Sequence, residues 1–302
     1  MERGERGNGP QGSVRAAGRP QRVALFGGWS RGAREEARLR LVAALEAAGL
    51  EVKTPEVATD LAQAPDLVVT VGGDGTLLDA VRRFRVWGAP FFAVNAGHLG
   101  FLSAVSLDQL DAAVDHVRRG DWIEMEAPLL RVLTEPADET GAPLPPQPFD
   151  CLNDLVVERG SPRTLTLSVR VAELEMAPVV GDGLVVATPL GSTAYARAAG
   201  GPMLHPALRA FQVVGLNLHH SVHTRYVDTP LVLPPGHTLE IVNLRPHDRR
   251  AQLTADGRVV AENFLRCTVA WIDEGVRLAY LPGFSYLKRA EAVLWGPPAP
   301  RG

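Results

Sequence analysis

The first third of the chain alternates between short apolar runs and segments in which apolar residues recur every three or four positions. The apolar runs predict strands, and the helical spacing between them predicts helices. The expected strands are Val23 to Phe26, a segment near Val52, Leu67 to Val71 and Phe91 to Val94, and the expected helices are Ala33 to Ala48, the segment after Thr76, and Leu107 to Arg119. This alternation predicts a parallel sheet covered by helices, whose carboxyl edge would carry the ligand-binding loops.

From Trp122 onward the helical spacing fades and short apolar runs of strand type take over. These runs are Leu129 to Leu133, Leu165 to Val171, Leu184 to Val186, Leu231 to Leu233 and Thr238 to Val242. They predict an antiparallel, sandwich-like half, interrupted by a Pro-rich exposed loop over Glu135 to Pro148. The fold class expected from both halves is an α/β N-terminal domain with a parallel sheet plus an all-β sandwich-like C-terminal domain.

A glycine-rich loop, Gly72 to Thr76, lies where an apolar strand stops and a helical pattern begins. Glycines allow close approach of the backbone to an anion, and a helix N-terminus supplies unpaired N–H groups, so the loop is typical of a phosphate site. The carboxylate of Asp74 would repel phosphate unless it accepts a proton from an attacking hydroxyl group. The alternative is a tight turn in which Asp74 is only a helix N-cap.

A second segment, Gly181 to Tyr195, runs from an apolar strand into a cluster of hydroxyl groups, glycines and one tyrosine, and Gly200 to Pro202 follows it. Hydroxyl donors, close backbone approach and a flat ring are the parts needed to hold the base and ribose of a nucleotide. The alternative is an ordinary capped loop with Tyr195 in the core.

Together these motifs make the chain resemble the NAD kinase family. The matching pieces occur in order: Gly72 to Thr76, Asn95 to Leu102, the pair Asn153 and Asp154, and the segment Asp182 to Tyr195 with its Gly-Gly-Pro tail. Diacylglycerol-type lipid kinases and phosphofructokinases carry loops similar to the first motif, whereas the Thr-Pro-x-Gly-Ser-Thr-Ala-Tyr block after it is specific. The resemblance covers nearly the whole chain after the first 20 residues.

The resemblance implies a role for each matching residue. Asp74 would be the base for the adenosine ribose 2′-hydroxyl of NAD, and Gly72, Gly73, Gly75 and Thr76 would lie near the substrate and the donor phosphates. Asn153 and Asp154 would clasp ribose hydroxyls, although they could instead form a turn before the strand Leu155 to Val157. Asp182 would contact the nicotinamide end, Thr193, Ala194 and Tyr195 would surround the adenosine, and Ala198 would also touch the substrate.

The same resemblance implies the cofactor, the partners and the division into domains. A divalent metal, Mg²⁺, would arrive with ATP, no protein metal site is expected, and the enzyme would be a dimer or tetramer of identical chains. We expect a disordered tail over 1–20, a nucleotide-binding α/β domain over 21–121, a β-rich NAD-binding domain over 122–276, and a segment over 277–302 that packs back on the first domain.

Composition bears on the partners and the cellular location of the protein. The formal net charge of −3 over 302 residues favours neither nucleic acid nor an anionic membrane as a partner. The two cysteines, Cys151 and Cys267, lack neighbours of ligand type and are interpreted as buried residues in a reducing compartment. No apolar segment of membrane-spanning length and no signal peptide is visible, so we expect a cytoplasmic protein.

Several positions depart from the family pattern, and four histidines could be either functional or structural. Asp79 stands where a basic residue is common, Leu190 and Ala198 where small hydroxyl residues are common, Arg258 where glutamine is common, and Tyr226 to Thr229 is an insertion. His98 is interpreted as a loop residue, and His219, His220 and His223 as structural because no carboxylate or cysteine joins them.

Two other functions stay open at this stage. A diacylglycerol-type lipid kinase would need a membrane-facing surface and would lack the Tyr195 block. A non-catalytic NAD-binding regulatory protein would have no need for the base in the intact Gly72 to Thr76 loop. Within the kinase interpretation, the sequence leaves open whether the donor is ATP, another triphosphate or polyphosphate, and whether NAD or NADH is preferred.

Overall fold

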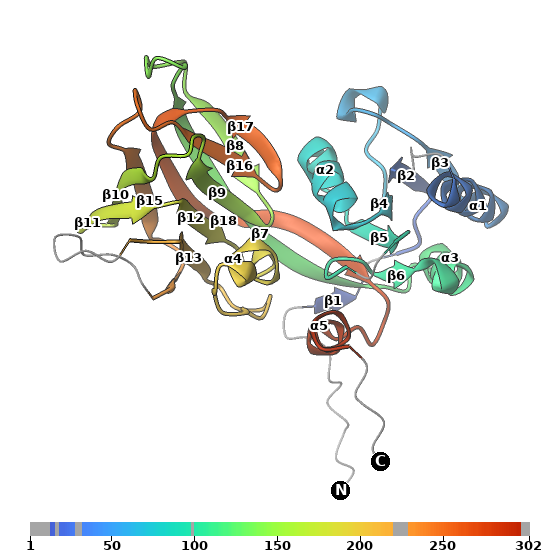
Figure 1. Ribbon diagram of the computed structural model, residues 1–302. Coiled ribbons are helices and arrows are strands. Elements are labelled where there is room, and N and C mark those ends of the chain that lie inside the picture. Colours follow the sequence, from blue (N-terminus) through green and yellow to red (C-terminus); the bar gives the residue numbers. More distant parts are fainter. Residues whose placement is uncertain (1–12, 16–17, 28–31, 98–99, 220–228, 297–302) are drawn as a thin grey trace, which may run out of the picture. The chain divides into compact units, whose positions relative to one another are not determined.

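The computed structural model of the chain describes residues 13–15, 18–27, 32–97, 100–219 and 229–296 (Figure 1). The chain divides into two compact units. The first unit comprises Met1–Ala127 and Val276–Gly302, and the second comprises Pro128–Gly275. Two long strands, β7 (Ile123–Pro136) and β18 (Phe264–Tyr280), pass from one unit into the other.

The first unit is built on a parallel sheet. Its strands are β2 (Arg22–Gly27), β3 (Glu51–Lys53), β4 (Leu67–Gly72), β5 (Phe91–Asn95) and β6 (Val105–Ser106). The order is β3-β2-β4-β5, and β5 also pairs in parallel with β6 and with the last residues of β18. Every residue of β4 is buried, as its continuous apolar run predicts. The expected parallel sheet is confirmed.

Helices follow the strands of this sheet (Figure 1). They are α1 (Ala33–Ala47), α2 (Asp74–Phe84), α3 (Leu110–Arg119) and α5 (Tyr286–Leu294), with 3₁₀ turns η1 (Ala58–Asp60), η2 (Arg85–Trp87) and η3 (Leu107–Gln109). Helix α2 buries one stripe, Leu77, Ala80, Val81 and Phe84. The helix expected to begin at Leu107 begins with η3, because Ser106 and Gln109 cap a tight first turn there.

The amino-terminal segment contains one short strand, β1 (Ser13–Arg15), which pairs antiparallel with Ile123 to Met125 of β7. The expectation that 1–20 is entirely disordered is therefore wrong for residues 13–15. The strand edge of β7 supplies backbone partners that a composition-based prediction cannot foresee.

The second unit consists of antiparallel strands in two sheets. One contains β8 (Gln147–Cys151), β10 (Leu165–Val171), β11 (Leu174–Gly181) and β15 (Thr238–Asn243) with parts of β7 and β18. The other has the order β14-β13-β12-β9-β16-β17, formed by β9 (Asp154–Arg159), β12 (Gly183–Ala187), β13 (Phe211–Leu216), β14 (Leu231–Leu233), β16 (Ala251–Ala255) and β17 (Arg258–Ala261).

Side chains from both sheets of the second unit share one apolar core. Leu155 and Leu184 of one sheet belong to the same buried cluster as Leu167 and Ile241 of the other, and Cys151 and Cys267 are buried within it as free thiols. This is the expected sandwich. The short η4 (Gly191–Thr193) and α4 (Tyr195–Ala198) follow β12 directly, and they carry the polar block identified in the sequence.

Candidate functional site

The glycine-rich loop of the first unit joins β4 to α2. Gly73 occupies the N-cap position in an extended conformation, and Asp74 is the first residue of α2. The carboxylate of Asp74 does not cap its own helix. It accepts the backbone N–H of Phe101 at 2.9 Å and that of Leu102 at 3.3 Å. The alternative in which Asp74 is a helix N-cap is therefore wrong. In the first turn of α2 the N–H of Thr76 donates to the carbonyl oxygen of Gly73 at 2.9 Å, and the helix N-terminus presents its positive dipole end to an anion.

The glycines around Asp74 fall into two groups. A Cβ at Gly72 would lie 2.1 Å from Oγ1 of Thr76, and one at Gly100 would lie 2.2 Å from Oδ1 of Asp74, so packing requires glycine at both positions. A Cβ at Gly73 or Gly75 would meet no atom of the described residues within 4 Å. No described packing contact requires glycine at these two positions, whereas close approach of a ligand to the backbone would.

Burial raises the pKa of Asp74, and the N–H groups of Phe101 and Leu102 and the charge of Arg289 act in the opposite direction. Arg289 comes from α5 and donates to the carbonyl oxygen of Gly100 at 3.1 Å and to Oγ of Ser103 at 2.9 Å. The carboxylate is thus held by two backbone donors and has its basicity increased by burial. A general base in an enzyme needs both properties.

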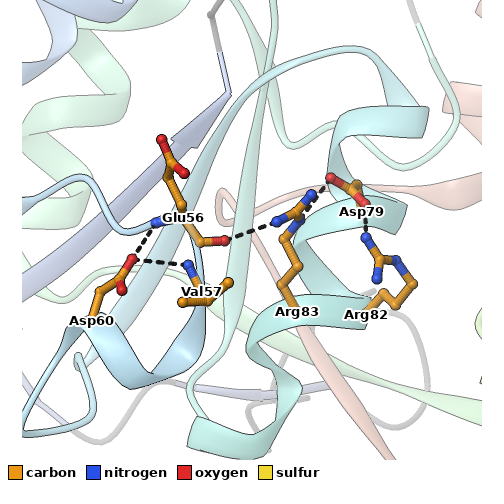
Figure 2. Close-up of polar contacts among 6 residues, drawn as sticks. All are labelled: Glu56, Val57, Asp60, Asp79, Arg82 and Arg83. Atoms are coloured by element: carbon orange, nitrogen blue, oxygen red, sulfur yellow. Dashed lines mark hydrogen bonds and ion pairs between the residues drawn. The ribbon is translucent and has the colours of Figure 1, made fainter.

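Farther along α2, Asp79 forms an ion-pair cluster with two arginines (Figure 2). Its carboxylate accepts from Arg82 and from Nε of Arg83 at 2.9 Å, and Arg83 also donates to the carbonyl oxygen of Glu56 at 3.0 Å. Asp60 of η1 stabilises the segment that contains Glu56, because its carboxylate accepts the N–H of Glu56 at 2.7 Å. Asp79 thus pairs with arginines of its own helix, and one of them, Arg83, connects α2 to the segment before η1.

In the second unit, Asn153 and Asp154 lie where β9 begins, and their side chains are buried. Oδ1 of Asn153 has no hydrogen-bond partner among the described residues. A buried acceptor without a partner costs roughly 1–3 kcal/mol, and a ligand hydroxyl that donates to it would remove that cost. Asp154 accepts the backbone N–H of Tyr195, while burial and the charge of Asp256 raise the pKa of Asp154 to about 7.

Asp256 is a residue of this site that the sequence did not reveal. Its carboxylate accepts the backbone N–H groups of Leu152 at 2.8 Å, Asn153 at 2.7 Å and Asp154 at 3.2 Å. An available signal was the Asp-Gly pair between the strands β16 and β17, since that dipeptide is typical of a hairpin turn. The Asp-Gly pair does not reveal, however, that this turn contacts the Asn153–Asp154 segment.

A pocket of about 450 Å³ in the second unit brings three of the predicted residues together, namely Asp182, Tyr195 and Ala198. The full lining is Glu158, Arg159, Asp182, Tyr195, Ala198, Ala199, Gly215, Leu216 and Asn217. Tyr195 is 43% exposed, so the alternative that placed it in the core is wrong. Its ring is accessible to a planar ligand, as the binding interpretation requires.

Asp182 in this pocket and Thr193 in the adjoining segment already have protein partners. The carboxylate of Asp182 pairs with Nε of Arg159 at 3.0 Å and accepts from the side chain of Asn217 at 2.8 Å. The hydroxyl group of Thr193 donates to the carbonyl oxygen of Leu190 at 3.1 Å, and Ala194 is exposed. Asp182 is consequently fixed in orientation before any ligand arrives.

Some predicted positions fall outside the described residues: His98, His220, His223 and the first three residues of the Tyr226 to Thr229 insertion. Over the rest of the chain, no group of three or more His, Cys, Asp or Glu side chains is arranged to hold a metal ion. Among the helices that the structure describes, none is long and apolar enough to cross a membrane.

Comparison with known proteins gives consistent matches over both units. Residues 34–122 match the ATP-NAD kinase N-terminal domain family, and residues 152–269 match the ATP-NAD kinase C-terminal domain family. NAD kinase 1 of Halalkalibacterium halodurans is 34% identical over 239 residues, which are 78% of this chain and 87% of that protein. An NAD kinase of Aromatoleum aromaticum is 31% identical over 300 residues, 92% of this chain and 95% of that protein.

Two solved structures share the fold. The yeast NADH kinase complexed with NADH superimposes with a TM-score of 0.76 at 21% identity, covering 93% of this chain and 89% of the yeast chain. An NAD kinase from Archaeoglobus fulgidus in complex with ATP gives a TM-score of 0.67 at 23% identity, covering 91% of this chain and 97% of that chain.

The α/β unit with its glycine loop, the β-rich unit and these matches define a phosphotransferase with an alcohol group as acceptor. The chain belongs to the NAD kinase family. The predicted family, fold class and kinase function are confirmed.

Proposed function

We propose that this chain transfers a phosphoryl group from a nucleoside triphosphate to the adenosine ribose 2′-hydroxyl of NAD, producing NADP. The observation that carries the proposal is Asp74: a half-buried carboxylate with a raised pKa in the glycine loop at the start of α2. Relatives named NAD kinase and fold neighbours solved with NADH or with ATP support the two substrates.

Asp74 would accept the proton of the hydroxyl group as its oxygen attacks the terminal phosphorus of the donor. One O–P bond forms, the bond between that phosphorus and its bridging oxygen breaks, and the nucleoside diphosphate leaves. The backbone at Gly72, Gly73 and Gly75 and the hydroxyl group of Thr76 would face the phosphates. The first unit would then supply the base and the phosphate-binding loop.

The backbone N–H groups of this loop are hydrogen-bond donors, which suit phosphate oxygens and cannot ligate a metal ion. We therefore propose that Mg²⁺ enters bound to the phosphates of the donor, where it would neutralise negative charge. Catalysis by the protein would consist of positioning and of proton acceptance at Asp74.

The second unit would hold NAD. Oδ1 of Asn153 would accept a ribose hydroxyl, and Asp154 would accept a second one. Because Asp182, Tyr195 and Ala198 line one pocket, neighbouring parts of one bound NAD would make the contacts with them. The ring of Tyr195 would stack on the adenine, Thr193 and Ala194 would border it, and Asp182 would contact the nicotinamide end.

We also propose that the protein acts in the cytoplasm as a dimer or tetramer of identical chains, as the resemblance to the family implies. Light scattering on the eluting peak of a size-exclusion column measures this directly. A single species with the mass of one chain, 32.4 kDa, would contradict the oligomer.

An assay of the purified full chain tests the function. The protein is incubated with NAD, ATP and Mg²⁺, and NADP is read by a coupled dehydrogenase; polyphosphate in place of ATP and NADH in place of NAD then define the donor and the acceptor. We expect NADP to form with NAD and ATP. Phosphorylation of diacylglycerol in vesicles without NADP formation would favour the lipid kinase, and a thermal shift by NAD without NADP formation would favour a non-catalytic NAD-binding protein.

A further inference from the structure

Asp256 connects the turn after β16 to the segment that precedes β9. One oxygen of its carboxylate accepts the N–H groups of Asn153 at 2.7 Å and Asp154 at 3.2 Å, and the other accepts that of Leu152 at 2.8 Å. The contact is reciprocal, because the N–H of Asp256 donates to the carbonyl oxygen of Asp154 at 3.0 Å. Three successive backbone donors on one half-buried carboxylate fix the conformation of the segment that bears Asn153 and Asp154.

The backbone conformation of the turn places this carboxylate beside the Asn153–Asp154 segment. Asp256 has φ +46° and Gly257 has φ +77°, both in the left-handed region, in a hairpin between β16 and β17. Aspartate and asparagine tolerate this region better than most residues other than glycine. Ala255, one residue before the turn, pairs with Leu155 of β9, so strand pairing sets the position of the turn relative to the Asn153–Asp154 segment.

We propose that Asp256 is a positioning residue for NAD binding: its carboxylate holds Asn153 and Asp154 in the conformation in which both can accept ribose hydroxyl groups. The inference rests on the proposed function, since it concerns the same NAD site. In this role Asp256 acts through its three backbone donors rather than through a contact with the substrate.

The charge of Asp256 has a second effect that a purely structural residue would not have. It is among the causes that raise the pKa of Asp154 to about 7, after burial, and the N–H of Tyr195 opposes both. Two further ionisable groups interact with Asp154: Cys151, whose own pKa is raised by burial and by Asp256, Asp154 and Asp150, and the phenol of Tyr195, whose pKa is raised by burial, Glu158, Asp182 and Asp154. Both of these groups are neutral near pH 7, and Asp256 is the charged side chain among the causes that shift the pKa of Asp154. Burial raises the pKa of Asp256 as well, and the N–H groups of Leu152, Asn153 and Asp154 oppose that rise.

The ionisation of Asp154 should make NAD affinity depend on pH. The ionised carboxylate of Asp154 would accept its ribose hydroxyl more strongly than the protonated carboxyl would, so NAD affinity should fall as the pH drops through about 7. Removal of the negative charge at Asp256 favours ionisation of Asp154, so the fall should then occur at lower pH.

The test compares Asp256→Asn with a matched control, Asp138→Asn, in the full-length protein. Oδ1 of Asp138 accepts the N–H groups of Thr140 at 2.8 Å and Ala142 at 2.9 Å, so it orders a loop of the same unit in the same way. The KM for NAD, the KM for ATP, and the pH dependence of NAD affinity between pH 5.5 and 8.5 are measured for both variants and the wild type.

For Asp256→Asn we expect the KM for NAD to rise by about tenfold or more, a change that corresponds to the loss of about one hydrogen bond to NAD. The KM for ATP should stay nearly unchanged. The acid fall in NAD affinity should move to lower pH. Asp138→Asn should lower stability and change neither quantity. If Asp256→Asn does not fold, Asp256→Ser, which also removes the charge, is expected to show the same two changes.

An active wild type together with an unchanged KM for NAD and an unchanged pH profile in the Asp256 variant would overturn this inference and leave the kinase function intact. A raised KM with an unmoved pH profile would overturn the action of Asp256 on Asp154. A wild type that neither binds NAD nor forms NADP would instead contradict the proposed function itself.

Discussion

The carboxylate of Asp74 accepts the backbone N–H of Phe101 at 2.9 Å, across 27 residues of sequence. The contact joins the glycine loop after β4 to the loop after β5, which are adjacent parallel strands. Gly100 makes the contact possible, because any side chain there would occupy the position of the carboxylate. The position of the proposed base therefore depends on a residue of a different loop.

We expect Gly100→Ala to reduce kcat strongly. Its Cβ would lie 2.2 Å from Oδ1 of Asp74, so the carboxylate must move, and a displacement of about 1 Å can cost on the order of a hundredfold in rate. Steady-state kinetics and a thermal unfolding curve measure the two effects separately. Gly160→Ala is the control, because its Cβ would make only ordinary contacts, at 3.4 Å from the carbonyl oxygen of Arg250. Equal kcat in the two variants would contradict this account of Gly100.

Arg289→Met should move the acid limb of the pH–rate profile to higher pH. The charge of Arg289 lowers the pKa of Asp74 against the effect of burial, so its removal lets that pKa rise further, and Asp74 becomes an ionised base only at higher pH. The variant also loses the hydrogen bonds to Gly100 and Ser103, so kcat should fall as well.

The control for Arg289 is Arg277→Met. Arg277 belongs to the same unit but pairs with Glu124 at 2.7 Å and has no part in the pKa of Asp74. Its removal should leave the acid limb in place. An acid limb that stays fixed in Arg289→Met, or that moves equally in both variants, would refute the coupling between Arg289 and Asp74.

Asn153→Ala separates a binding role from a structural one. Oδ1 of Asn153 is buried without a partner among the described residues, so its removal takes away a desolvated acceptor and should cost little stability. The lost hydrogen bond to the ribose should weaken NAD binding by about tenfold. Calorimetry gives the affinity, and unfolding without NAD gives the stability. A large loss of stability with unchanged affinity would show that Asn153 only shapes the turn.

Asp154→Asn should make the protein less sensitive to pH. The folded pKa of Asp154 is about 7, above the unfolded value of about 3.9, so the folded state binds more protons between these values and its stability falls as the pH rises from about 4 to 7. Asparagine removes that loss, so the variant should gain more stability at pH 8 than at pH 5, by up to a few kcal/mol.

Urea unfolding at pH 5 and pH 8 measures this difference. Asp138→Asn is the control, since the pKa of Asp138 is lowered by its hydrogen bonds and the group stays ionised at both pH values. Its loss should therefore destabilise the protein equally at the two pH values. An equal effect of Asp154→Asn at pH 5 and pH 8 would contradict a raised pKa at Asp154.

The strands and helices of the first unit could be predicted from the sequence because each pattern is local. The apolar run Leu67 to Val71 is buried on both faces of a parallel sheet, and the residues that follow Asp74 form an amphipathic helix. Strand β1 could not be predicted, because Ser13–Arg15 pair with residues of β7 more than 100 positions away. Sequence patterns indicate the faces of an element but not its distant backbone partner.

The candidate site divides in the same way. Asp74, Asn153, Asp154 and Tyr195 stand in motifs that could be recognised from their neighbours. Arg289 and Asp256 could not be recognised, because each contacts a segment about 100 residues or more away in the sequence, and backbone groups of that segment are among its partners. Residues that bind or react are marked by their chemistry, whereas residues that position them are identified only in the fold.

The most direct test of the central claim is the turnover of Asp74→Asn in the presence of NAD, ATP and Mg²⁺, with NADP as the measured product and calorimetry as the measure of NAD binding. Asparagine keeps the size of the side chain and can still accept the N–H of Phe101, but it cannot take up the proton of the ribose hydroxyl. The account predicts that kcat falls by about a hundredfold to ten-thousandfold while NAD still binds. Turnover close to that of the wild type would contradict the assignment of Asp74 as the base.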